Sequence, residues 1–272
     1  MIYVKTLVDD NLRLPRRAEH GLSLWVEVDP PSGGRMSFLL DSGQRAAVLS
    51  QNAVLAGVDL RSADAVVISH GHYDHSGGLP VLAGIGLKCD VFTGVDSERR
   101  RFSTQVGLGD GGRKMLKPIG MPFPDTLASL SVRRVAGVLR VSPWLTVFSL
   151  PVAAPPNARL LAADGVSPDT FSDEVFALIS DGERTLLFGG CTHHGLPFLL
   201  DFVFGNLGVA RVDCFIGGLH LQGCPEEDVR RVARVAERYG VASYAPMHCS
   251  GDAALAVWRE MFSVVDGPDF SL

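Results

Sequence analysis

The sequence predicts a layered α/β fold, because strand-like and helix-like segments alternate along the chain. Short apolar runs typical of buried strands recur, and amphipathic segments follow some of them. At 272 residues, of which 46% are hydrophobic, the chain can bury a large core as a single domain that covers residues 1–272. The alternation alone does not distinguish a two-sheet sandwich from a doubly wound sheet.

The strand-like runs lie, in chain order, at residues 1–5, 65–68, 185–188, 214–216 and 242–247. Helices are predicted over residues 196–204 and 225–239. In the second helix the apolar residues fall on one face, Pro225 stands in the first turn, and Gly240 supplies a stop. The last three runs each end near a histidine, and the carboxyl ends of parallel strands meet at one edge of a sheet. We therefore expect these histidines to converge.

The first run has neither the charge pattern nor the apolar length of a signal peptide, and no apolar run approaches the length of a membrane span. Five cysteines without a close pairing pattern suit a reducing compartment better than a disulfide framework. We therefore expect a soluble, cytoplasmic protein without a membrane partner.

The second run leads into the dense motif His-Gly-His-Tyr-Asp-His at residues 70–75. Alternate side chains of an extended stretch share a face, so His70 and His72 can bind one ion. Asp74 and His75 lie past a turn and can reach a second ion. Four such donors are too many for one ion that keeps an open position, so the motif predicts two divalent ions. Zn²⁺ suits these ligands best, with Mn²⁺ or Fe²⁺ as alternatives.

Residues 94–140 form a basic insertion that is rich in glycine and proline, with nine basic residues against four acidic ones. Its composition predicts a long irregular excursion, which acts either as a lid or binding loop or as a solvated surface loop. Guanidinium groups bind phosphate bidentately, so we expect a small phosphorylated or otherwise anionic substrate. The net charge of −5 argues against nucleic acid as a partner.

The 70–75 motif matches the metal-binding signature of the metallo-β-lactamase superfamily, and Leu-Asp-Ser-Gly at residues 40–43 resembles the turn that precedes it there. More narrowly, the chain resembles the branch described as dihydropterin ribofuranosyl-aminobenzene phosphate synthases or as metal-dependent hydrolases of β-lactamase superfamily II. The resemblance implies a four-layer αββα sandwich with the metals at one edge. The blocks that carry the narrower resemblance lie at residues 19–23, 69–78, 190–193, 217–220 and 248–251.

The resemblance also implies that His248 is the terminal metal ligand. Superfamily members commonly have a third histidine for the first ion between the motif and residue 192, where this chain has none, so His193 is the candidate that completes the first site. Cys191 stands where many members have a bridging aspartate. Cys191 and Asp41 are therefore candidate additional ligands, although a buried reduced thiol is the commoner state of cysteine.

Three further histidines have open roles. His220 follows a double glycine and is a candidate catalytic residue, because a neutral histidine beside the metals can donate a proton or bind a phosphate oxygen. Structural packing is its alternative. His20 could line the cleft as an additional ligand or cap a turn. His194 stands where the branch usually has proline, and its role is open.

These residues predict a binuclear hydrolase that uses a metal-bound hydroxide, with Asp74 both ligating an ion and orienting the water. The resemblance implies an alternative, a 7,8-dihydropterin-6-methyl-4-(β-D-ribofuranosyl)aminobenzene 5'-phosphate synthase-like transferase, in which an aromatic amine attacks carbon and a diphosphate leaves. A metal-retaining binding or regulatory protein without turnover is a second alternative, which the intact motif disfavours. The apolar stretch 198–204 could serve a homo-oligomer as easily as the core.

Overall fold

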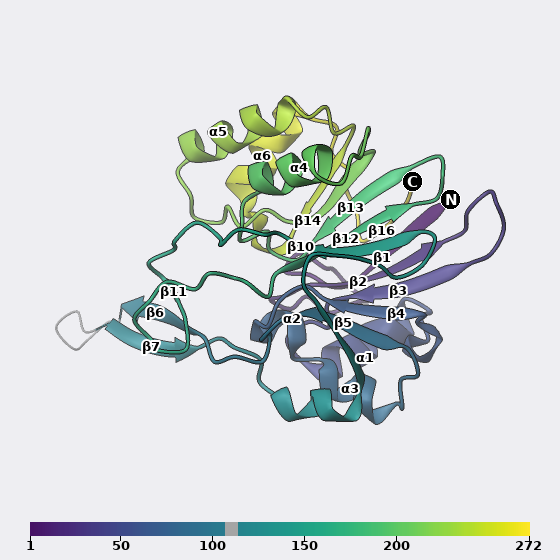
Figure 1. The fold of residues 1–272 in the computed structure, drawn as a ribbon, viewed down its shortest axis with the longest axis horizontal. Helices are drawn as coiled ribbons and strands as arrows, with labels where there is room; N and C mark the ends of the chain where they lie inside the picture. Colours follow the sequence, from purple (N-terminus) through teal and green to yellow (C-terminus); the bar gives the residue numbers. More distant parts are fainter. Residues whose placement is uncertain (107–113) are drawn as a thin grey trace.

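Two mixed β-sheets form the body of the molecule in the computed structural model, which describes residues 1–106 and 114–272 (Figure 1). The first sheet contains, in spatial order, β16 (Asp269–Ser271), β1 (Ile2–Val8), β2 (Ser23–Val28), β3 (Met36–Leu40), β4 (Ala65–Ile68), β5 (Asp90–Gly94) and β8 (Ser131–Val135). The second contains β15 (Tyr244–Met247), β14 (Cys214–Gly218), β13 (Thr185–Gly189), β12 (Val175–Ser180), β10 (Leu145–Ser149) and β9 (Val138–Arg140).

The two sheets pack face to face through a shared apolar core. In this core the rings of Phe38 on β3 and Phe188 on β13 pack edge to face, with their centroids 5.6 Å apart. The outer face of the first sheet is covered by α1 (Ala46–Leu55) and α3 (Leu79–Gly84). The outer face of the second is covered by α4 (Leu196–Gly205), α5 (Glu226–Glu237) and α6 (Asp252–Met261). The predicted αββα sandwich is therefore confirmed (Figure 1).

The predicted strands and helices all form, with small shifts at their ends. In α5, Val229, Ala233 and Ala236 are buried against the second sheet, as the predicted apolar face requires. Two sets of strands are parallel: β3, β4, β5 and β8 in the first sheet, and β13, β14 and β15 in the second. The loops that follow these strands therefore lie at one edge of the sandwich.

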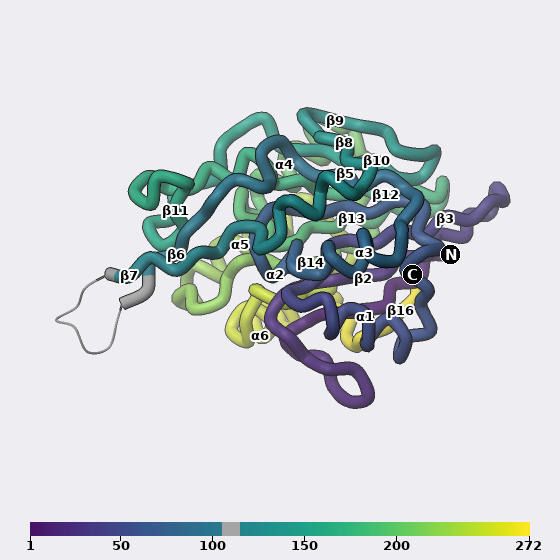
Figure 2. Tube along the Cα trace, turned by 90° about the horizontal axis from the view of Figure 1, so that it is seen from below, coloured from purple at the N-terminus to yellow at the C-terminus, as the bar shows by residue number. Residues whose placement is uncertain are grey.

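The basic segment 94–140 is not the irregular excursion that its composition predicts. Its strands β6 (Phe102–Val106) and β7 (Lys114–Pro118) pair with each other, and β11 (Leu160–Leu161) joins them in a small third sheet that projects from the body (Figures 1 and 2). Strands β8 and β9 are edge strands of the two main sheets, and η2 (Pro124–Ser129) precedes β8. The composition did not indicate these strands because each is short and lacks a continuous buried apolar run. Its residues 107–113 lie outside the described residues.

The apolar stretch at residues 198–204 is mainly core, because Leu199, Leu200 and Val203 of α4 are fully buried, whereas Phe198 is exposed. The homo-oligomer stays a prediction. None of the helices in the described part of the chain combines the length and apolar character that crossing a bilayer requires.

Candidate metal centre

The loops at the shared edge of the sandwich contain most of the strained backbone of the molecule. Among the described residues, six non-glycine residues have positive φ, and five of them lie in or against these loops. A positive φ costs energy for residues other than glycine, and such strain gathers at functional sites. The five residues are Asp41, Phe171, Thr192, His220 and His248, with φ between 47° and 57°.

One group of metal-competent atoms comes from His70, Cys191 and His193, whose ligand atoms all lie within 4.8 Å of one another. The Nε2 atoms of His70 and His193 are 3.2 Å apart. His72 faces the same space, since its ring centroid lies 4.5 Å from that of His70 and 5.1 Å from that of His193. These four residues are the candidate ligands of a first ion.

A second group contains His75, Cys191 and His248, again within 4.8 Å. The Asp74 carboxylate lies beside it, with Oδ2 at 3.4 Å from Nε2 of His248 and 3.9 Å from Nε2 of His75. His248 is the first residue of η3 (His248–Ser250), which follows β15. It is the residue that the family resemblance implies as the terminal ligand. The structure thus brings together, at the edge of the sandwich, all six predicted metal ligands.

Cys191 lies between the two groups, because it is a member of both and its Sγ is 3.1 Å from Nε2 of His75. The preceding Gly190 makes this position possible. A Cβ on Gly190 would lie 2.0 Å from Oγ of Ser69, so only glycine lets the end of β13 approach the end of β4 this closely. The sulfur atom of Cys191 therefore lies close to donor atoms that come from both sheets.

Asp41 orients two of the histidines rather than facing the ligand groups itself. Its Oδ2 accepts hydrogen bonds from Nδ1 of His75 at 2.7 Å and from Oγ of Ser69 at 2.7 Å, and Oδ1 accepts the Ser69 N–H. Because the Ser69 hydroxyl proton goes to Asp41, Oγ accepts from Nδ1 of His70 at 3.0 Å. Both histidines therefore keep their Nε2 lone pairs for an ion.

The electrostatics of the three histidines in the first group also favour metal binding. Burial lowers the pKa of His70 and His193 well below 6.5 and that of His72 to about 3, so all three are neutral. Burial raises the pKa of the Cys191 thiol, which must lose its proton to bind an ion. Among the described residues, Nε2 of His72 and Oδ1 of Asp74 are buried without a hydrogen-bond partner. Imidazole, thiolate and carboxylate donors in this arrangement fit first-row divalent metal ions.

The sequence analysis did not single out residues 169–174, which precede β12. This segment contacts the loop after β4 and the loop after β13, which both carry predicted metal ligands. Asp173 accepts the Gly71 N–H at 2.8 Å, and Glu174 accepts the N–H groups of His193 and His194 at 2.7 and 3.1 Å. Phe171 stacks on the His193 ring with centroids 3.7 Å apart and an interplanar angle of 13°. This segment, named the acidic clamp below, ties the loop after β4 to the loop after β13.

The acidic clamp is itself fixed by a buried arginine. Arg101 is 1% exposed and pairs with both Asp169, at 2.6 Å, and Asp173. A fully buried guanidinium requires such partners, because an unpaired charge is costly in the interior. Part of the positive charge in the 94–140 segment therefore stabilises the site.

The remaining histidines take different positions. His194 is buried away from the two groups, where Nδ1 donates to Glu174 at 2.5 Å and Nε2 meets the Val152 carbonyl at 2.9 Å. Its ring thus supports the loop that carries His193. His220 is half-buried, its centroid is 4.3 Å from that of His193, and its Nδ1 has no hydrogen-bond partner in the described part of the chain. It lies beside the first group and forms a further cluster of metal-competent atoms with Cys191 and Cys249.

Sequence reasoning also missed Asp9 and Asp10, which follow β1. The Oδ2 atom of Asp9 accepts the His248 N–H at 2.7 Å, and Oδ1 of Asp10 accepts from Nδ1 of the same histidine at 2.6 Å. His20 lies next to them and reaches Asp74. The paired acidic residues at the end of a strand-like run were the available signal.

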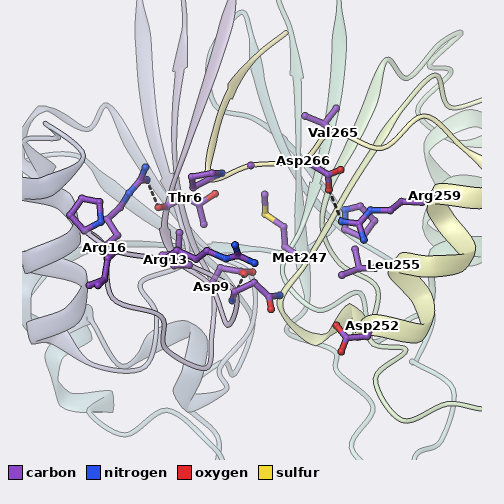
Figure 3. Close-up of a pocket in the computed structure, with 17 residues that line it drawn as sticks. Thr6, Asp9, Arg13, Arg16, Met247, Asp252, Leu255, Arg259, Val265 and Asp266 are labelled. Atoms are coloured by element: carbon purple, nitrogen blue, oxygen red, sulfur yellow. Dashed lines mark hydrogen bonds and ion pairs between the residues drawn. The ribbon is translucent and has the colours of Figure 1, made fainter.

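Two cavities lie near these acidic residues. One of about 520 Å³ is bounded by the loop after β1, by α6 and by the C-terminal segment, and Figure 3 shows Arg16 and Arg259 there with their partners Thr6 and Asp266. None of the predicted metal ligands lines it. A second cavity, of about 290 Å³, is lined by Asp10 and by His248, a member of the second group.

A cation also lies beside the 70–75 motif. Nζ of Lys117, on β7, lies 5.2 Å from the ring centroid of Tyr73, which stands between the predicted ligands His72 and Asp74 in the sequence and whose ring is 6.3 Å from that of His20. Its side chain is exposed. The small third sheet thus places a positive charge over the Tyr73 ring.

Known sequences resemble this chain in the same region and beyond it. A sequence model of the Metallo-beta-lactamase superfamily matches residues 28–86, which include the 70–75 motif. The 7,8-dihydropterin-6-methyl-4-(beta-D-ribofuranosyl)-aminobenzene-5'-phosphate synthase of Methanocaldococcus jannaschii is 23% identical, covering 96% of this chain and 92% of the synthase. An uncharacterized protein of the same organism is 24% identical, covering 97% of this chain and 96% of its own length.

Solved structures share the fold. Tm1679, a metal-dependent hydrolase of the β-lactamase superfamily, has a TM-score of 0.77 at 23% identity, covering 100% of this chain and 99% of its own. Zn²⁺-bound PqqB from Methylobacterium extorquens has a TM-score of 0.51 at 16% identity, covering 99% of this chain and 100% of its own. The resemblance that the sequence motifs indicate is therefore confirmed.

Proposed function

Because the chain has the metallo-β-lactamase fold, we propose that it is a binuclear metal-dependent hydrolase that acts on a small anionic substrate. The observation that carries the proposal is the pair of donor groups joined at Cys191. Two adjacent divalent ions bound there would lower the pKa of a shared water and polarise a phosphoryl or carbonyl oxygen.

The side chains of the site have matching roles in this proposal. Asp74 would orient the attacking water through Oδ1, which has no hydrogen-bond partner among the described residues, and its Oδ2, 3.4 Å from Nε2 of His248, would help to hold the second ion. His220, beside the first group, donates a proton to the leaving group. Lys117, above Tyr73, supports an anionic substrate because its ammonium group can bind a phosphate oxygen. Nucleic acid and membrane surfaces are not part of the proposal.

The test combines metal content with turnover. Purified protein is measured by elemental analysis and screened against phosphodiesters, phosphomonoesters and lactones, together with His72→Ala and with Lys88→Ala, an exposed control. We expect about two ions per chain in the wild type and the control, with hydrolysis of at least one substrate class. We expect His72→Ala to lose metal and activity together. Two ions with no hydrolysis of any class would contradict the hydrolase.

The likeness to the synthase over 96% of this chain favours a second candidate, a transferase of the same class. In that reaction the amine nitrogen bonds to the methylene carbon of a pterin, the carbon–oxygen bond breaks, diphosphate leaves and the amine loses a proton. Diphosphate release from a dihydropterin-methyl diphosphate separates the two candidates. Release that requires an arylamine supports the transferase, whereas equal release in water alone supports the hydrolase.

A further inference from the structure

The side chains of His20 and His248 both contact the carboxylate of Asp10 through Nδ1. The Oδ2 atom of Asp10 lies 2.9 Å from Nδ1 of His20, and its Oδ1 atom lies 2.6 Å from Nδ1 of His248. A carboxylate only accepts hydrogen bonds, so both imidazoles donate through Nδ1. The neutral form of each ring then carries its free lone pair on Nε2.

Both Nε2 atoms lie near the same carboxylate oxygen, which belongs to Asp74 beside the second donor group. The Oδ2 atom of Asp74 lies 3.2 Å from Nε2 of His20 and 3.4 Å from Nε2 of His248, and the two ring centroids are 4.8 Å apart. A histidine that binds a metal commonly donates its other N–H to a carboxylate. His20 therefore repeats the contacts that His248, a ligand implied by the family resemblance, makes with Asp10 and Asp74.

The backbone holds His20 in this place. Gly21 has φ of 131°, and a Cβ there would lie 2.2 Å from the Asp74 carbonyl oxygen, which also accepts the Leu22 N–H at 3.3 Å. Glu19, on the other side, is buried and paired with Arg45. The segment is thus packed directly against the loop that carries Asp74.

We propose that His20 is a further ligand of the second ion, and that Asp10 is the carboxylate that orients His20 and His248 together. The inference rests on the binuclear site of the proposed function, but not on the reaction that the site catalyses. The two histidines differ in access, because the side chain of His20 is 46% exposed and that of His248 is 1% exposed. His20 is therefore the donor on the solvent side, at the place where a substrate oxygen would arrive.

The alternative is an ion pair alone, in which a protonated His20 bridges Asp10 and Asp74 and never binds metal. The experiment that separates the two titrates metal-free protein with Zn²⁺ in competition with a chromophoric chelator, which yields the dissociation constant of each ion. The variants are His20→Ala and Asp10→Asn. Arg17→Ala is the matched control, since Arg17 is exposed on the same segment.

We expect His20→Ala to raise one dissociation constant about 10-fold or more and to leave the other unchanged. Asp10→Asn should raise the same constant at least as much, because it affects two histidines. The long-range ¹H–¹⁵N spectrum of the wild type should show the His20 Nε2 resonance shift when Zn²⁺ saturates the chain.

Unchanged constants in His20→Ala, with no shift of the His20 resonance, would overturn the proposal and leave only the ion pair. A wild type that binds a single ion would overturn it together with the binuclear site. A wild type that binds two ions without hydrolysing any substrate would contradict the proposed function alone, since the titration does not depend on turnover.

Discussion

At the scale of single residues, the site depends most on Cys191, because both donor groups include its sulfur. Replacing it by alanine removes one ligand from each ion, so we predict that Cys191→Ala weakens both ions at least about 10–100-fold. Cys191→Asp should retain two ions, since a carboxylate can also bridge them. Elemental analysis after dialysis against a weak chelator measures both effects.

A cobalt-substituted sample checks the same prediction by a second route. A thiolate bound to Co²⁺ gives a charge-transfer absorption in the near ultraviolet, which should be present in the wild type and absent in Cys191→Asp. Cys89→Ser is the control, because Cys89 is a free thiol outside the donor groups. Full metal content in Cys191→Ala would show that the sulfur is only a buried neighbour of the ligands.

At the scale of elements, the acidic clamp holds loops that carry predicted ligands, although none of its own residues is a predicted ligand. Glu174 accepts the N–H groups of His193 and His194. In Glu174→Gln the neutral amide replaces one acceptor oxygen by a donor, so one N–H loses its partner. We predict that the affinity for the first ion falls about 10–100-fold, with the second ion little changed. Competitive Zn²⁺ titration measures this, and exposed Ser172→Ala is the control on the same segment. An equal loss of both ions would indicate a general loss of structure instead.

Arg101 gives a prediction about stability rather than affinity. Its removal leaves the buried carboxylate of Asp173 without a countercharge and leaves Asp169 with only the longer contact to Arg99, at 3.5 Å. Breaking a buried pair from one side costs about 3–5 kcal/mol, and we predict that loss for Arg101→Leu in urea unfolding. The exposed neighbour Arg100→Leu should change the free energy of unfolding by less than about 0.5 kcal/mol. Similar values for the two variants would refute the role of the buried pair.

The sequence predicted those features of the site that local pattern determines. Apolar runs locate the strands, and parallel strands bring their carboxyl ends to one edge, so His193, His220 and His248 could be placed together before the structure was known. Strands β8 and β9 could not be recognised in the same way, because they are short edge strands whose side chains are mostly exposed, so no buried apolar run marks them.

Asp10 and Glu174 were missed for a different reason. Asp10 meets His248 across 238 residues of sequence, and Glu174 meets His193 only after β12 and β13 have paired. An acidic side chain carries no sequence mark of the partner that folding brings to it. Supporting residues of a metal site therefore need the structure, whereas the ligands themselves stand in recognisable motifs.

At the scale of the whole molecule, the ions should act as crosslinks between the two sheets. The candidate ligands in the loop after β4 come from the first sheet, and Cys191, His193 and His248 come from loops of the second. An ion at 100 times its dissociation constant stabilises the folded state by about 2.7 kcal/mol, and each kcal/mol shifts the melting temperature of a chain of this size by roughly 2–4 °C. Because two ions contribute, we predict that a strong chelator lowers the melting temperature of the loaded protein by roughly 10–20 °C. Calorimetry measures the shift. The double variant His72→Ala/His248→Ala, which lacks a ligand in each group, is the control, and chelator should leave its melting temperature unchanged. If the loaded wild type also melts at the same temperature with and without chelator, the ions do not hold the sheets together, and the edge of the sandwich must be stable through the acidic clamp and the core alone.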